Sequence, residues 1–225
     1  MFSYVPEEQR PMSYVAAMGI LRLANKYMVK FLRNRMIARF HRAIPTKFEE
    51  ITVKRKDGLT QTFSEGASFF DYRLVELFRE CRVLALLPMI MYIFATKSGK
   101  SSKRLLSSRS ISQQDLHVLI AAREAILLKV PKLFTSALLE VADGCSKGEV
   151  CSPQHRLLLL DSYLSLPLAK QEAILDLELE TIPCPACDTL RKSKFRQGRK
   201  KLWDELPILF GLPPWTDLLK EFDTV

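Results

Sequence analysis

Four of the five cysteines occur as two pairs whose spacing suits the binding of a metal ion. Five residues separate Cys145 from Cys151, two separate Cys184 from Cys187, and Cys81 stands apart. A Cys-x2-Cys pair is a common half-site for structural zinc, because both thiolates reach one tetrahedral ion around a tight turn. Turn-forming residues surround both pairs: Gly144, Gly148, Pro153, Pro183 and Pro185. The four paired thiols are therefore candidate metal ligands, with structural zinc as the candidate cofactor.

Other interpretations of these thiols stay open. Reduced cysteines also behave as small buried hydrophobic residues, so the four need not share a site. A redox pair is less favoured, since the flanking sequence lacks the strand-then-helix pattern of a thioredoxin unit. His155 could replace one ligand, but a lone histidine in a loop is more often solvated. His41 and His117 occur on helical patterns and carry no stronger signal.

No group of residues predicts catalysis. Gly99-Lys100-Ser101 ends like a phosphate-binding loop, but that motif requires a glycine where this chain has Phe94. Glu172, Asp176 and Glu180 are spaced by four, which also describes an exposed helix face, and no partner histidine is near them in the sequence. We therefore expect a protein that is not an enzyme and has no small-molecule substrate.

The composition predicts an intracellular globular protein. The 225 residues are 48% hydrophobic and 26% charged, with a formal net charge of +9, which permits an acidic partner without requiring one. An odd number of cysteines fits poorly with a disulfide framework, and residues 1–10 lack the pattern of a signal peptide. The longest apolar run, residues 83–95, is too short to span a bilayer and contains Pro88. We expect a cytoplasmic or nuclear protein that does not enter a membrane.

Apolar spacing predicts two amphipathic helices near the N-terminus, at residues 14–27 and 29–44, with Ser13 as a cap and Pro45 as a stop. The residues expected to face inward are Val15, Met18, Leu21, Leu23 and Ala24, then Phe31, Leu32, Met36, Ile37 and Phe40. The basic residues expected to face outward on the second helix are Lys30, Arg33, Arg35, Arg39 and Arg42.

The rest of the chain also favours helices, so the fold class expected is mainly α with at most one short β-hairpin. Asp57-Gly58 favours the turn of that hairpin. Residues 83–94 are nearly all apolar, which predicts a helix buried on all sides at the centre of the core. Ser112 and Asp115 resemble a capping box before a helix that runs toward Ala142 and bends near Pro131. Further expected segments are a surface loop at 97–110 and short helices at 157–166 and 171–179.

The C-terminal region combines a basic run, residues 191–201, with an apolar closing block. An exposed helix face is the favoured interpretation of the run, ahead of a nuclear-import signal or acidic contact. Sequence-specific nucleic-acid reading is not expected, since one phenylalanine is too little for a stacking platform. Pro207 is expected to end a helix and Gly211 to allow a sharp reversal. The closing residues expected to pack back on the body are Trp203, Leu206, Phe210, Leu212 and Trp215.

Several short sequence segments, in the same order along the chain, resemble segments of the BTB/POZ proteins of the large fungal group. Residues 21–29 with 32–33 are similar to the closing helices of the BTB domain, and 44–46 to the break that follows. Residues 75–77 through 86–92 resemble a central buried helix pair, and 203–215 a C-terminal signature. The fungal group often carries cysteines at the two places noted above.

The resemblance implies a truncated BTB/POZ fold. A complete BTB domain begins with a strand-rich region that has no counterpart ahead of Phe2–Gln9. Residues 1–45 would be the closing helices of a BTB-like domain, and 46–225 a helical bundle-like extension.

The resemblance also implies a function. BTB proteins are generally adaptors for protein–protein interaction, and many recruit cullin-type ubiquitin ligases through helices that correspond to 29–44 here. The alternative is a nuclear or chromatin-associated basic protein. Salt-dependent binding to random DNA would favour the chromatin-associated alternative. Co-purification with a cullin would favour the adaptor.

Overall fold

The computed structural model describes residues 11–51, 62–64, 72–96, 111–145, 148, 151, 174–176, 179 and 181–223. Regular structure in these ranges is helical, which confirms a mainly α fold. The α-helices are α1 (Tyr14–Lys26), α2 (Lys30–Ala43), α5 (Arg73–Glu80), α6 (Leu87–Ala95), α8 (Gln113–Leu139), α11 (Pro185–Leu209) and α12 (Trp215–Asp223). Three 3-10 turns accompany them: η2 (Phe48–Glu50), η5 (Leu84–Leu86) and η6 (Ile174–Asp176).

Extended structure within the described ranges is limited to a parallel bridge between Met12 and Phe63. The hairpin predicted at Asp57-Gly58, the segments 97–110 and 157–166, and His155 lie outside the described residues. So does most of the predicted helix 171–179. In the part of the chain that is described, no helix is both long and apolar enough to cross a bilayer.

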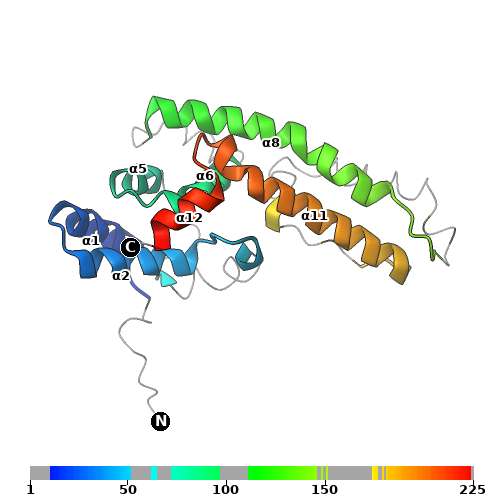
Figure 1. The fold of residues 1–225 in the computed structure, drawn as a ribbon, viewed down its shortest axis with the longest axis horizontal. Helices are drawn as coiled ribbons and strands as arrows, with labels where there is room; N and C mark the ends of the chain where they lie inside the picture. The colour runs from blue at the N-terminus through cyan, green and yellow to red at the C-terminus, as the bar shows by residue number, and fades with distance from the viewer. Residues whose placement is uncertain are drawn as a thin grey trace, which may run out of the picture.

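Two long helices form an arm that extends from a cluster of shorter helices (Figure 1). α8 and α11 lie alongside each other and run in opposite directions, so the end of α8 comes near the start of α11 (Figure 1). Lys129 of α8 pairs with Glu205 of α11 at 2.6 Å, and Lys194 of α11 pairs at 3.0 Å with Glu140, the residue that follows α8. The antiparallel pairing is what brings the two cysteine pairs to one place.

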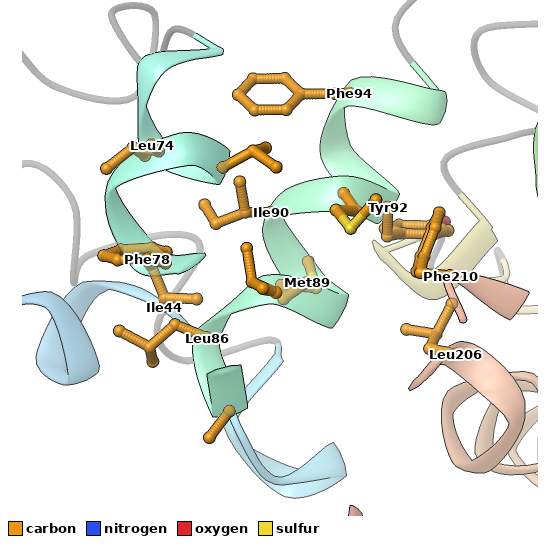
Figure 2. Packing of buried hydrophobic residues seen from close by; sticks show 14 of the residues in the cluster. Ile44, Leu74, Phe78, Leu86, Met89, Ile90, Tyr92, Phe94, Leu206 and Phe210 are labelled. Atoms are coloured by element: carbon orange, nitrogen blue, oxygen red, sulfur yellow. The ribbon is translucent and has the colours of Figure 1, made fainter. Parts of the chain in front are cut away.

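The centre of the core is η5 and α6, as predicted from the apolar run. Figure 2 shows Leu74 and Phe78 of α5 on one side of this segment, and Leu206 and Phe210 on the other. The central side chains with no exposed surface are Leu86, Leu87, Met89, Ile90, Met91 and Tyr92. Pro88 is accommodated because it lies in the first turn of α6, where a helix needs no N–H.

The faces predicted for α1 and α2 are partly wrong. Val15 and Leu23 are each 56% exposed, and Phe31 is 69% exposed. Leu32 is exposed as well. Arg39, expected outside, is buried and donates to the Thr62 carbonyl at 3.3 Å. Both helices carry apolar residues on two sides, and periodicity alone does not say which side meets the core.

The predicted pairing of Ser112 with Asp115 at the start of α8 is present, with the N-cap half of a capping box formed. The Asp115 N–H donates to Ser112 Oγ at 3.0 Å, and that hydroxyl donates to Asp115 Oδ2 at 2.9 Å. Ser13 holds the N-cap position of α1 but makes no side-chain capping hydrogen bond. Pro131 lies inside α8, which continues to Leu139.

Pro207 does not end α11 as predicted, but lies inside it, and the helix continues to Leu209. A proline has no N–H for the carbonyl four residues before it, here that of Trp203. The indole N–H of Trp215 donates to that carbonyl at 2.8 Å, and the two indole rings stack with centroids 4.7 Å apart. The Trp215 side chain thus supplies the hydrogen bond that the Trp203 carbonyl loses to the proline.

Three of the described helices end in the same reversal, with a residue of positive φ after the last turn. These residues are Met28 (φ 55°), Arg82 (φ 52°) and Gly211 (φ 65°). At the end of α11, the Leu212 N–H donates to the Pro207 carbonyl at 2.8 Å and the Gly211 N–H to Ile208 at 3.0 Å, a Schellman motif. The reversal predicted at Gly211 is confirmed.

Exchanging residue types at two of these positions should give opposite effects. Met28→Gly is expected to raise the free energy of unfolding by about 1 kcal/mol, because it relieves a conformation that costs side-chain-bearing residues about 1–2 kcal/mol. Gly211→Ala should lower it by about 1 kcal/mol, although a Cβ at Gly211 would meet nothing within 4 Å. Urea unfolding of the two variants measures both effects, and shifts in the same direction would contradict this account.

Candidate metal centre

Two of the four cysteines belong to the start of α11. Cys184 is the N-cap and Cys187 the third helical residue, with Pro185 in the first turn. N–H groups in a first helical turn have no partner within the helix, and that of Cys187 donates to the Cys184 thiol. The Cys-x2-Cys spacing therefore puts both sulfurs at the positively polarised end of a helix, which favours thiolates.

Cys145 and Cys151 come from the segment that follows α8. The Cys145 N–H donates to the Ala142 carbonyl at 3.1 Å and closes a turn after the helix. Gly144, in that turn, lies close to α11, where a Cβ on it would be 3.9 Å from the Ala186 Cβ. The turn thus carries Cys145 to the N-terminus of α11.

The four sulfurs come together in space, as the sequence predicted, although 32 residues separate Cys151 from Cys184. All four lie within 4.8 Å of one another, and the Cys145 and Cys184 sulfurs are 3.9 Å apart. Four sulfurs at about 2.3 Å from one tetrahedral ion are about 3.8 Å from each other. None of the five cysteines forms a disulfide. The arrangement is therefore compatible with a single ion at the centre of the four thiols.

The cluster is enclosed by its own small hydrophobic core. Cys151, Cys184 and Cys187 are at most 4% exposed, and Cys145 is partly buried. Ala142, Ile182 and Ala186 are the other described residues that pack here. Among the described residues this small core is separate from the main one.

The environment changes the acidity of two thiols in opposite directions. The Cys187 N–H lowers the pKa of Cys184 to about 6, outweighing the effect of burial. Burial raises the pKa of Cys151 to about 12, with hydrogen bonds from the neighbouring cysteines acting in the same direction. Of these two thiols, Cys184 is therefore the better prepared to bind a cation as a thiolate.

Asp188 holds Ile182, a residue that packs against the cluster, and the sequence analysis did not identify this role. Its carboxylate accepts from the Ile182 N–H and from Arg191, both at 3.1 Å, and pairs with Lys192 at 2.6 Å. Burial alone would raise the pKa of this carboxyl, but the three donors, led by Lys192, lower it. Its place right after Cys187, in the first turn of an expected helix, is the signal that could have identified it.

A set of four thiolates has a defined chemistry. Soft sulfur ligands in tetrahedral geometry are typical of structural zinc, and four protein ligands leave no position for a substrate. Cys81 lies apart in the main core, as predicted, where burial raises the pKa of its thiol. His41, also on a helix as predicted, makes a hydrogen bond of 2.8 Å with Thr46 Oγ1.

No protein-family model, curated protein or solved structure matches this chain. The resemblance to BTB/POZ proteins and the domain boundary after residue 45 therefore stay predictions.

The basic run lies on α11, and much of its charge is bound within the protein. Arg191 is buried beside Asp188, which corrects the prediction of an exposed face at that position. Arg199 donates to the Leu175 carbonyl, and Arg196 lies 5.6 Å from the centre of the Phe48 ring. Lys194 and Lys200 form the ion pairs Lys194–Glu140 and Lys200–Asp204. The ion pairs of Arg191, Lys194 and Lys200 reduce the charge that the run presents to a nucleic acid.

Proposed function

We propose that this chain is a non-enzymatic protein-interaction module with an arm held by structural zinc. One observation carries the interaction part: seven large apolar side chains between residues 15 and 32 are exposed on the α1–α2 hairpin. They are Val15, Leu23, Tyr27, Met28, Val29, Phe31 and Leu32. Soluble monomers seldom expose large continuous apolar patches, which mark interaction sites. Met28, 84% exposed and at positive φ, is the most prominent.

The zinc part of the proposal rests on the four-cysteine cluster. Zinc would be held by Cys145, Cys151, Cys184 and Cys187, and would join the end of α8 to the start of α11. With its four positions filled by thiolates, the ion would act on stability and on the shape of the arm. This role agrees with the small size of the hydrophobic cluster that the described residues form around the four thiols.

The resemblance suggests that this chain is an adaptor, and the partner that we propose first is a cullin-type ubiquitin ligase. The cullin would bind through the α1–α2 hairpin. The support is positional: the exposed apolar residues lie on the same helices that resemble the closing helices of a BTB domain. A partner bound here would cover Phe31 and Met28, which the described part of the chain leaves exposed.

Calorimetric titration of the zinc-loaded full chain with the N-terminal domain of a cullin tests this partner. We expect binding at physiological salt that Phe31→Asp weakens at least tenfold. Leu128→Asp is the matched control, since Leu128 is 62% exposed on α8, away from the hairpin. Absence of binding, or equal loss in both variants, would reject the cullin partner.

A nuclear or chromatin-associated basic protein is the second candidate, supported by the net charge of +9. Binding to random duplex DNA that weakens steeply as salt rises would favour it. The ion pairs made by the basic run are the reason to rank it second.

A further inference from the structure

One face of α1 forms a regular apolar ridge that nothing in the described part of the chain covers. Val15, Gly19, Leu23 and Tyr27 follow one another at intervals of four residues, so they line one side of the helix. Val15 and Leu23 are 56% exposed and Tyr27 is 66% exposed. Rows of residues spaced by four are the ridges that fit between the ridges of a second helix.

Gly19 makes a gap in the middle of this ridge. A glycine inside a helix costs about 1 kcal/mol relative to alanine. The fold gives no reason for that cost, because a Cβ on Gly19 would meet nothing within 4 Å. A bare backbone at this point lets another chain approach α1 closely, which is a common reason for a glycine inside a regular element.

The charge around the ridge selects the kind of partner. Residues 11–44 contain seven lysines and arginines and no aspartate or glutamate. Lys26 and Lys30 are exposed next to Tyr27, at the tip of the hairpin. Glu76 and Glu80 of α5 both pair with Arg22, at 3.9 Å and 2.9 Å. A second copy of this chain would bring basic residues against basic residues, whereas an acidic partner would neutralise them.

We propose that the Val15–Tyr27 ridge of α1 docks an amphipathic helix of an acidic partner protein. The apolar side of that helix packs on Val15, Leu23 and Tyr27 and crosses α1 at Gly19. Its flanking carboxylates face Lys26 and Lys30. This inference rests on the proposed interaction function, to which it adds the shape and charge of the partner.

Two displayed libraries of single helices test the proposal on the zinc-loaded full chain. Both randomise the same apolar positions, and the flanking positions are glutamate in one library and lysine in the other. We expect the glutamate library alone to yield binders, with affinity that falls at least tenfold for Leu23→Asp and is unchanged for Leu128→Asp. Ridge-dependent binders from both libraries, or from neither, would overturn the proposal.

Gly19→Ala separates docking from stability. Since alanine is the better helix former and the added methyl group meets nothing, this variant should melt at a higher temperature than the parent. The same methyl group fills the gap, so affinity for the selected acidic helices should fall at least fivefold. A stabilised variant that binds them as well as the parent would show that the helix does not cross at Gly19.

If the ridge binds a membrane or a second copy of the chain instead, different measurements would show it, and either result would also overturn the proposal. Sedimentation of the chain with phosphatidylserine vesicles, lost in Leu23→Asp, would indicate a membrane surface. Self-association in analytical ultracentrifugation, lost in the same variant, would indicate a second copy. Binding of the cullin domain through Phe31 without any ridge-dependent helix would reject this inference alone and leave the interaction function standing.

Discussion

Removal of zinc is expected to unfold the outer end of the α8–α11 arm and to lower the melting temperature of the whole chain. Without the cation the four cysteines lose the bonds that would join the end of α8 to the start of α11, and the described residues packed around them are small or few. Structural zinc contributes about 10–16 kcal/mol of apparent binding free energy in small zinc fingers, where folding depends on it. The main core around α6 is separate from this site and should stay folded.

Two measurements test this expectation on protein purified under reducing conditions. Elemental analysis should find one zinc per chain, and Cys187→Ser should abolish it. Hydrogen exchange after treatment with a chelator should lose protection at the end of α8 and the start of α11, while α6 keeps its protection. Cys81→Ala is the matched control, because Cys81 lies in the main core and should leave the zinc content unchanged. A chain without stoichiometric zinc would contradict the proposed centre.

The clustering of the four cysteines was predictable because part of its signal is local. The spacing of Cys184 and Cys187, with prolines beside them, predicts a turn that presents two thiols, and a second pair within the same half of the chain completes the set. The meeting of the two pairs depends on the antiparallel contact between α8 and α11, which no short motif encodes. The candidate ligands could be identified from local spacing, but their proximity results from the pairing of α8 with α11.

The central helix and the start of α8 were predictable for a similar reason. An uninterrupted apolar run has only one stable place, the interior, and the Ser112–Asp115 box acts between residues three apart. The contrast is Arg39, whose buried position depends on the Thr62 carbonyl, a partner distant in the sequence. Leu23 shows the same limit, since its exposure depends on which side of α1 meets the core.

Pro207 illustrates how tertiary contact overrides a local rule. A proline in a helix usually ends or bends it, because the carbonyl four residues earlier loses its donor. In this chain the Trp215 indole provides that donor, so the helix continues. Predicting this from the sequence would require knowing that α12 folds back over α11.

Deletion of residues 202–225 is expected to give an aggregating or unfolded product. Trp203, Leu206 and Phe210 are at most 3% exposed in the main core, and α12 packs against η5. The deletion would therefore expose apolar surface of the central segment to water, and it would remove the packing energy of the deleted side chains. Size-exclusion chromatography and thermal melting of the truncated chain measure both effects.

Point variants separate the contributions within this closing block. Trp203→Ala should cost about 3–5 kcal/mol, because it empties a large buried site and removes the stack with Trp215. Trp215→Phe keeps an aromatic ring but leaves the Trp203 carbonyl without its donor, which should cost about 1–3 kcal/mol. Ile208→Ala, at a side chain 61% exposed on the same helix, is the matched control and should change stability by less than about 0.5 kcal/mol. If the truncated chain and Trp203→Ala both melt like the parent, the closing block is a separate docking motif, since a segment that completes the core cannot be removed without cost.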